Sequence, residues 1–371
     1  MKYIAIIGAG SAGLFAAKKL SENQDFRITV FEKANKVATK LRASGGGKAN
    51  ILNADIQPRH YNNAEYMQRF LQKVNYEQIR DEFAQMGLKM SVDEEGRVYP
   101  SSFFSQTVVD VLLNNLGENV TIRCGFNVEN VTKAEKKWQI NDEKELFDEV
   151  IFASGTPAGI IPKNRRNFCS YLLDFQLKRT EFTPSLSGFK IKSYPKSLFG
   201  CKAKVQATLL QNGEPIFKEN GEVVFKEDGI SGIVILNLSA HYNRLDDKRN
   251  CEISLNFLPD DDEYDVKNHL LKFHDVAGLV HPKLNRLFLQ NRFNLRDFRL
   301  KISDPYELEF AQVCHGGIEV TEITENFELK RFPHLYVVGE MLNIDGVCGG
   351  YNLFFAFASA CCAANFINYG N

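Results

Sequence analysis

The stretch that decides the fold is Lys2-Tyr-Ile-Ala-Ile-Ile-Gly-Ala-Gly-Ser-Ala-Gly13, close to the N-terminus. Its apolar run, residues 2–7, predicts a buried β-strand. Three glycines come directly after that run: Gly8, Gly10 and Gly13. Residues 14–20 then predict a helix, and residues 27–31 predict a second strand. A strand, a glycine-rich turn, a helix and a strand in this order form the βαβ unit of a doubly wound α/β fold.

The glycine spacing is that of a dinucleotide-binding turn, and it has the strand before it and the helix after it that such a turn requires. The first glycine permits a tight turn, the second lets the backbone approach a pyrophosphate, and the third allows close packing of helix on strand. The start of the helix offers N–H groups to the phosphates. An acidic residue at the end of the second strand would accept hydrogen bonds from ribose hydroxyls. The residues expected in these roles are Gly8, Gly10, Ser11, Ala12, Gly13 and Glu32.

Two further features favour FAD over NAD. A basic, glycine-rich segment, residues 33–50, follows Glu32 where simple NAD domains continue with another βα unit. Near the C-terminus an apolar strand ends in Gly339-Glu340, and Gly349-Gly350 then precedes a helix. A carboxylate at such a strand end can hold the ribityl hydroxyls, and the helix N-terminus can face the flavin ring, where reduction builds negative charge. Both ends of the chain would then bind one cofactor.

The remaining residues that we expect at the cofactor come from this basic segment, from the predicted strand ends and from the C-terminal loop and helix. They are Lys33, Lys40, Ser44, Gly45, Gly46, Asn50, Val128, Ala153, Gly155, Gly339, Glu340, Asp345, Gly349, Gly350, Tyr351, Asn352 and Leu353. The sequence has no second Gly-x-Gly-x-x-Gly turn, so we expect NAD(P)H to act only as a transient electron donor that docks over the flavin. No metal site is expected.

Because flavin itself carries the hydride, the reaction does not require any particular catalytic side chain. Two residues are candidates for a catalytic role. His315, beside Gly316-Gly317, could donate a proton to a substrate carbonyl, although an ordinary surface or core histidine is the simpler interpretation. Tyr351, at the start of the last helix, could touch the ring or a substrate, and is equally ordinary as a packed aromatic side chain.

At 371 residues the chain is longer than one typical domain. We expect a discontinuous FAD-binding Rossmann-type domain, residues 1–185 and 306–371, interrupted by an insert, residues 186–305. Alternating short runs and Asn-Gly turns predict a β-barrel-like part over about 186–258, and a helical part follows over about 259–305. The other helices expected are 64–87, 105–116, 264–290 and 352–366. The other strands expected are 119–123, 138–140, 149–153, 307–320 and 335–338.

Composition narrows the class of protein. The formal net charge is −1, which argues against a broad basic surface for nucleic acid. No apolar run approaches the ~18 residues of a membrane span. The eight cysteines form no Cys-x-x-Cys pair, so we expect reduced thiols and a cytoplasmic protein, with a small-molecule substrate as its partner.

The chain resembles the YhiN/BaiN-like family of NAD(P)/FAD-dependent oxidoreductases, which includes aminoacetone oxidase-like flavoproteins. The resemblance covers most of the length, and it depends on the N-terminal turn with Glu32-Lys33 and on five further motifs. These are Lys40–Asn50, Gly96–Ser101, Asp228–Gly232, Gly316-Gly317 and Gly339–Leu353. It implies a split flavin domain with a barrel-like and helical insert, and enzymes that pass hydride through FAD, some of them reducing conjugated ketones with NAD(P)H.

The sequence departs from the family pattern in several places, including the following two. Ala49 stands where the family usually has a cysteine, and residues 153–166 lack the usual downstream glycine cluster. The leading expectation is an FAD-dependent oxidoreductase that passes electrons from NAD(P)H, or from an amine or carbonyl compound, to a ketone, an enone or oxygen. These departures motivate one alternative, a flavin-binding sensor or assembly protein without efficient turnover. A second alternative is an NAD-only dehydrogenase.

Overall fold

The computed structural model describes residues 1–159, 169–291 and 293–370. It divides into two compact units, one made of Met1–Phe182 with His315–Asn371 and the other of Thr183–Cys314. The chain therefore leaves the first unit close to the predicted position and returns to it several residues later than predicted.

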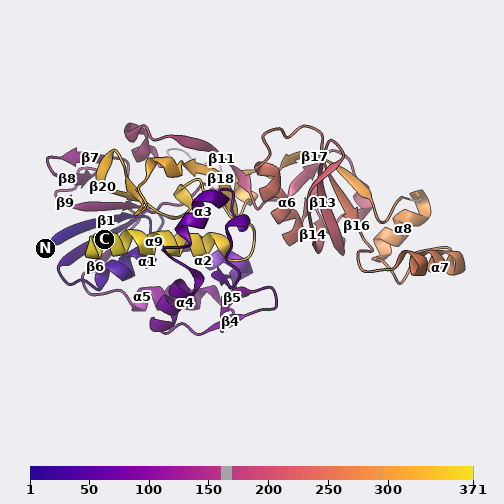
Figure 1. The fold of residues 1–371 in the computed structure, drawn as a ribbon, viewed down its shortest axis with the longest axis horizontal. Helices are drawn as coiled ribbons and strands as arrows, with labels where there is room; N and C mark the ends of the chain where they lie inside the picture. Colours follow the sequence, from indigo (N-terminus) through magenta and orange to yellow (C-terminus); the bar gives the residue numbers. More distant parts are fainter. Residues whose placement is uncertain (160–168, 292, 371) are drawn as a thin grey trace. The chain divides into compact units, whose positions relative to one another are not determined.

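The centre of the first unit is a six-stranded sheet in the order β19-β20-β10-β1-β2-β6. Figure 1 labels β20, β1 and β6 of this sheet. Its strands are β1 (Lys2–Ile7), β2 (Phe26–Glu32), β6 (Val120–Cys124), β10 (Glu149–Phe152), β19 (Glu328–Leu329) and β20 (Phe332–Val337). All neighbouring pairs are parallel except β19 with β20. Ile6 lies opposite Val30 on one side and Ile151 on the other, which fits strands buried on both faces. The carboxyl ends of the parallel strands meet at one edge, where α/β proteins bind their ligands.

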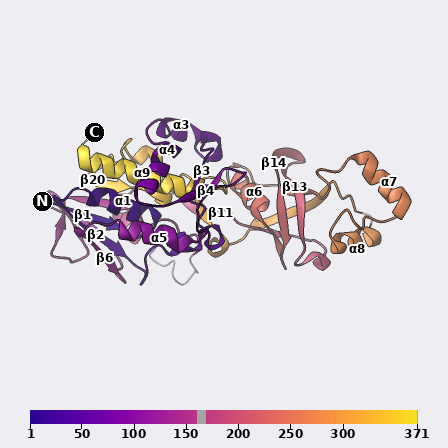
Figure 2. The same ribbon diagram turned by 90° about the horizontal axis from the view of Figure 1, so that it is seen from below.

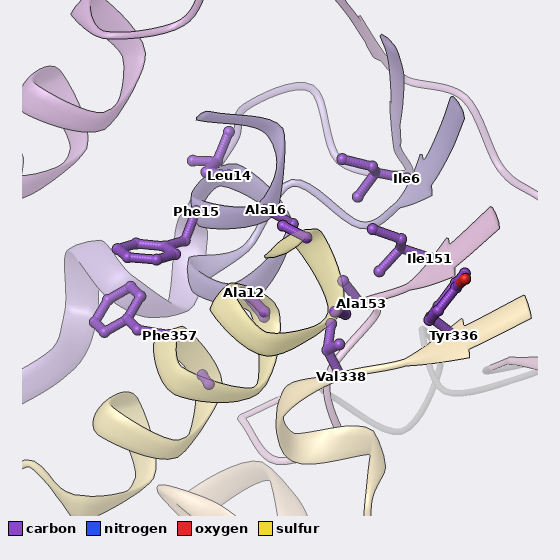
Figure 3. Packing of buried hydrophobic residues seen from close by; sticks show 14 of the residues in the cluster. Ile6, Ala12, Leu14, Phe15, Ala16, Ile151, Ala153, Tyr336, Val338 and Phe357 are labelled. Atoms are coloured by element: carbon purple, nitrogen blue, oxygen red, sulfur yellow. The ribbon is translucent and has the colours of Figure 1, made fainter. Parts of the chain in front are cut away.

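Two helices from opposite ends of the chain pack together on this sheet. They are α1 (Ser11–Ser21) and α9 (Tyr351–Tyr369). Figure 3 shows Phe15 of α1 beside Phe357 of α9, and their ring centroids are 5.4 Å apart. Both rings are fully buried, and burial of one such side chain stabilises a fold by about 1.5–3 kcal/mol. The C-terminal helix is thus part of the core that begins at β1.

The rest of the first unit surrounds this layer (Figure 2). Its helices are α2 (Thr39–Ala43), α3 (Ala64–Phe70), α4 (Tyr76–Gln85) and α5 (Ser105–Asn114). Its small sheets are β3 (Leu52–Asn53) with β4 (Met90–Val92) and β5 (Arg97–Pro100), and β7 (Val131–Ala134) with β8 (Lys137–Ile140) and β9 (Leu146–Phe147). The single helix expected over 64–87 is two helices. The break lies at Asn75, whose side chain accepts a hydrogen bond from the N–H of Gln78 and so starts α4 afresh.

The second unit contains a closed barrel in the order β12-β15-β14-β13-β16-β17. Its strands are β12 (Phe189–Ile191), β13 (Lys202–Gln211), β14 (Glu214–Phe225), β15 (Gly229–Ser231), β16 (Cys251–Asn256) and β17 (Phe298–Pro305). Helix α6 (Ile233–Asn243) lies within the segment expected to be β-barrel-like, where no helix was predicted. The barrel also takes β17 from the segment expected to be helical.

The helical segment of the second unit is not continuous. It consists of α7 (Glu263–Phe273) and α8 (Pro282–Asn291), whereas one helix was expected over 264–290. The break follows His274, which adopts a left-handed conformation with φ of +59° and so ends α7.

Two adjacent strands carry the chain between the units. They are β11 (Arg179–Ser185) and β18 (Val313–Ile318), which form a two-stranded sheet. Across the described residues, no helix is long and apolar enough to cross a membrane.

Candidate functional site

The turn after β1 contains two glycines that the protein's own packing requires. A Cβ on Gly8, whose φ is +110°, would lie 2.5 Å from the carbonyl oxygen of Ala153. A Cβ on Gly13 would lie 1.9 Å from the carbonyl oxygen of Gly8. Both contacts are far below van der Waals distance, so these two glycines hold β1, α1 and the end of β10 together.

Gly10 is different, because beyond its two chain neighbours no described protein atom lies within 4 Å of the Cβ that it lacks. Its φ of −84° is one that any residue adopts. Nothing in the described chain therefore demands a glycine here, and the open space lies at the start of α1. No side chain among the described residues caps that helix start. An open cradle beside uncapped N–H groups fits the pyrophosphate of a dinucleotide.

Glu32, at the end of β2, is tied to the turn through both carboxylate oxygens. Oε2 accepts a hydrogen bond of 2.8 Å from the N–H of Ala9, and Oε1 accepts one of 2.8 Å from the N–H of Ala34. A carboxylate oxygen has a second lone pair, so each can still accept from a ribose hydroxyl. The segment after β6 lies beside this strand end, since Phe126 donates its N–H to the Glu32 carbonyl. Val128, predicted at the cofactor, is buried in that segment.

Two strand-end segments and helix α2 meet around Glu340, which follows β20. Its Oε2 atom lies 2.8 Å from Nζ of Lys40 on α2. Thr156, in the loop after β10, has its Oγ1 atom 3.2 Å from the same Nζ. Gly155 is close enough that a Cβ on it would lie 3.8 Å from Oε2 of Glu340. The predicted residues Lys40, Gly155 and Glu340 therefore come together, and Thr156 joins them although the sequence did not single it out.

The glycines before α9 are held by two asparagines of the segment around β3. Asn53 donates from Nδ2 to the carbonyl of Gly349, at 2.9 Å. When the side-chain nitrogen of Asn50 faces Leu52, it donates to the Leu52 carbonyl, and the side-chain oxygen accepts from the N–H of Gly350. Gly350 has a φ of +94°, and a Cβ on it would lie 2.2 Å from the Leu52 carbonyl oxygen. The N-terminus of α9 is thereby fixed at the same edge of the sheet. Among the described residues no side chain caps it.

The two candidates for a catalytic role differ in their surroundings. His315, on β18, has its Nδ1 atom 2.8 Å from Oδ1 of the buried Asp345. Tyr351 is itself buried, its ring centroid is 4.3 Å from that of His60, and its carbonyl accepts from the Tyr61 hydroxyl at 3.0 Å. A catalytic role for either residue stays a prediction.

Most of the other residues predicted at the cofactor have local structural contacts. Asn352 accepts from the N–H of Gly346 and donates to its carbonyl, both at 2.9 Å. Ser44 donates to the carbonyl of Leu41, and Gly45 and Gly46 adopt left-handed conformations in the turn after α2. Gly339 donates its N–H to Ser359 on α9. Lys33 is exposed, and Leu353 packs against the core. Residues 160–166, part of the segment that departs from the family pattern, lie outside the described residues. Within the described part, no cluster of acidic, cysteine or histidine side chains is arranged for a metal.

Comparison with known proteins gives one family and several distant relatives. The family model described as "HI0933-like protein Rossmann domain" matches residues 2–366. A 3-dehydro-bile acid delta(4,6)-reductase of Clostridium scindens is 26% identical, with 97% of each chain covered. A ribosomal RNA dihydrouridine synthase of Escherichia coli is 24% identical, with 98% of this chain and 97% of that protein covered.

Among solved structures, the 3-ketosteroid delta1-dehydrogenase of Sterolibacterium denitrificans has the same fold. It aligns with a TM-score of 0.55 at 9% identity, over 100% of both chains.

Proposed function

This chain belongs to the HI0933-like family of Rossmann-domain proteins and is an FAD-dependent oxidoreductase, and we propose that it reduces a carbon–carbon double bond conjugated to a carbonyl group. The hydride would come from NADH or NADPH. An NAD-only dehydrogenase is set aside, because the residues at the carboxyl edge of the sheet and before α9 fit the longer FAD molecule.

The observation that carries the proposal is a chemical likeness between the two named relatives. A 3-oxo bile acid with double bonds at positions 4 and 6 is a conjugated dienone. The double bond of uracil that is lost in dihydrouridine is also conjugated to a carbonyl. In both substrates the carbonyl withdraws electrons from the alkene, so its β carbon accepts hydride and its α carbon then accepts a proton. One arrangement of flavin and proton donor serves both.

The residues at the edge of the sheet fit FAD, and bound FAD supplies the hydride chemistry. The turn around Gly10 would hold the pyrophosphate beside the start of α1. Glu32 would accept from the adenosine ribose, and Lys40 with Glu340 would hold the ribityl hydroxyls. The start of α9, held by Asn53, would offer N–H groups to the flavin ring and favour negative charge there.

We propose a small-molecule substrate instead of an RNA, because the net charge of −1 gives no surplus of basic side chains to neutralise a phosphate backbone. We also propose a cytoplasmic location. All eight cysteines are unbridged, as expected where thiols stay reduced.

The test is anaerobic reduction of the purified yellow protein by NADH or NADPH, followed by mixing with candidate oxidants while flavin absorbance is recorded. Cyclohexenone and a 3-oxo-Δ4 steroid are expected to reoxidise the flavin, and cyclohexanone, which lacks the alkene, is the matched control. A uridine-containing rRNA fragment as the only effective oxidant would contradict the small-molecule substrate. A flavin that neither nicotinamide reduces would favour the sensor alternative.

A further inference from the structure

Strand β18 places His315 next to the loop that leads into α9. The residues after it, Gly316 and Gly317, have φ values of +102° and +126°. A Cβ on Gly316 would lie 2.3 Å from the Glu181 carbonyl oxygen, and one on Gly317 would lie 2.6 Å from the Met341 carbonyl oxygen. The backbone of β18 is thus pressed between β11 and the segment after Glu340, which allows no freedom at position 315.

The partner of His315 is a carboxylate with almost no contact with solvent. Asp345 is 2% exposed, whereas the side chain of His315 is 20% exposed. Burial of a carboxylate is costly unless it is paired, and the 2.8 Å contact with Nδ1 supplies a pairing group. The imidazole therefore has one nitrogen directed into the protein, while the ring remains partly accessible.

The position of Asp345 is fixed from its other side by Asn62. The side-chain oxygen of Asn62 accepts from the N–H of Asp345 at 3.1 Å, and its own N–H donates to the Asp345 carbonyl at 2.9 Å. Its Nδ2 atom also donates to the carbonyl of Asn343, at 3.3 Å. Asp345 is thus held by Asn62 in a loop between two other predicted flavin contacts, Glu340 and Gly349.

We propose that His315 gives the substrate its proton from Nε2 and that Asp345 is the residue that positions the ring for this step, an inference that rests on the proposed function. Asp345 accepts the hydrogen bond from Nδ1–H. When both ring nitrogens carry hydrogen, the proton on Nε2 is the one that remains for transfer.

The step balances over the whole reaction. The β carbon of the alkene gains the hydride that NAD(P)H loses, and the π electrons of the double bond move toward the α carbon and the carbonyl oxygen. The α carbon then forms its new C–H bond as the Nε2–H bond breaks. His315 is left neutral with its hydrogen on Nδ1, still bonded to Asp345, and regains a proton from solvent. NAD(P)H is oxidised by two electrons, and the alkene is reduced by two.

The chain contains a matched control for this pair. His334 has its Nδ1 atom 3.1 Å from Oε2 of Glu149, which is 3% exposed. Glu149 starts β10, so this pair lies at the amino-terminal end of the strand, away from the cofactor edge. His334→Gln and His315→Gln therefore make the same chemical change in similar pairings, and only the second is expected to affect the reaction.

The kinetic test is anaerobic rapid mixing of the flavin-loaded proteins. In His315→Gln, reduction of the flavin by NADPH should be unchanged, while reoxidation by cyclohexenone should slow by roughly 10²–10⁴-fold, the usual contribution of a general acid. Asp345→Asn should fall between this variant and the wild type, and His334→Gln should match the wild type. Equal reoxidation rates in His315→Gln and the wild type would overturn the role of His315 as proton donor.

A second readout does not depend on turnover. In flavin-loaded protein labelled with ¹⁵N-histidine, at a pH where the ring is neutral, His315 should carry its hydrogen on Nδ1. In Asp345→Asn an amide N–H can donate to Nδ1, and the hydrogen should move to Nε2. His315→Gln assigns the signal by removing it. A His315 spectrum that is the same in Asp345→Asn and the wild type would overturn the positioning role.

Two further outcomes are distinguishable. If Asp345→Asn fails to retain flavin, Asn62→Ala replaces it, because this variant leaves the carboxylate in place. Asn62→Ala should slow reoxidation of the flavin without slowing its reduction by NADPH. An unaltered reoxidation rate in Asn62→Ala would overturn the role of the loop. If no conjugated carbonyl compound reoxidises the wild-type flavin, the proposed function is contradicted and the proton-donor role is overturned with it. The imidazole spectrum still decides the positioning role in that case.

Discussion

Nζ of Lys40 lies 2.8 Å from Oε2 of Glu340, across 300 positions of sequence. The two side chains are 44% and 21% exposed, so the pair itself is worth only about 0–1 kcal/mol. Its importance is positional, because it joins the basic segment after β2 to the strand end that precedes α9. The insert interrupts the chain between these two residues without separating them in space.

Replacement of Gly10 by valine should remove FAD and leave the fold intact. Beyond its chain neighbours, no described atom lies within 4 Å of the missing Cβ, so a larger side chain fills the space proposed for the pyrophosphate. The measurements are the flavin-to-protein ratio after gel filtration and the melting temperature of the apoprotein. Gly13→Ala is the contrasting variant and should lower stability itself, because its Cβ would lie 1.9 Å from a carbonyl oxygen. Stoichiometric FAD in a folded Gly10→Val protein would disprove the proposed role.

Replacement of Glu32 by alanine should weaken FAD binding at least tenfold. It removes the acceptors for Ala9 and Ala34 as well as the proposed ribose contact, and hydrogen bonds to a charged group are each worth about 1.5–3 kcal/mol. The dissociation constant is measured by titration of apoprotein with FAD. The control is Glu22→Ala, which removes a surface partner of Lys18 at the C-terminal end of α1. This variant should bind FAD normally. An unchanged constant in Glu32→Ala would count against the ribose contact.

Replacement of Asn53 should show that the loop before α9 is part of the flavin site. Asn53→Asp keeps the oxygen that accepts from the N–H of Asp55 and loses the donor to Gly349, while Asn53→Ala loses both. Each lost hydrogen bond should cost about 1 kcal/mol of stability. FAD affinity should fall in both variants, since the donor to Gly349 is missing from each. Normal FAD affinity in Asn53→Asp would show that the Gly349 contact is not needed.

Replacement of Gly316 by alanine should destabilise the first unit, because the left-handed backbone and the 2.3 Å approach to Glu181 both exclude a Cβ. The loss should be about 1–3 kcal/mol or more and is measured by urea denaturation. Gly213→Ala, at another positive φ but with open space around it, separates backbone strain from steric clash. Equal losses in the two variants would mean that the close packing of β18 contributes nothing.

The vicinal cysteines of α9 should be slow to alkylate. Desolvation raises the pKa of Cys361 to about 11 and that of Cys362 to about 12, and it also raises the pKa of Cys169 to about 11. A raised pKa leaves little thiolate at pH 8, and reactivity should increase as the pH rises toward these values. Exposed Cys124 should be labelled first by iodoacetamide, as followed by mass spectrometry. Rapid alkylation of the Cys361 and Cys362 thiols at pH 8 would favour a redox role for these two residues.

The sequence was sufficient to predict the doubly wound fold and the use of flavin as cofactor. The run before Gly8 is β1 over Lys2–Ile7, and the glycine spacing located α1 and the end of β2 correctly. These features are local, because a short apolar run, a turn and a helix each leave their own pattern. The family identification and the FAD-dependent chemistry were predicted from the same motifs and are confirmed.

The contacts made by loops far apart in the chain could not be predicted in this way. Asn53 and Asn62 are ordinary polar residues in the sequence, and they acquire a role only when their segment meets the loop before α9. Helix α6 was missed because residues 233–238 are all apolar except Asn237, a pattern that short buried strands and buried helices share. The break at Asn75 did have a signal, since an asparagine followed three residues later by glutamine is a capping box.

The pairing of β11 with β18 also bears on how such a protein could arise. Because the outgoing and returning strands are neighbours, a short turn could join them and close a plain hairpin, leaving the remaining polypeptide topologically complete. Recombination at this pair of strands could therefore exchange the barrel for another module and leave the predicted cofactor residues of the first unit unchanged.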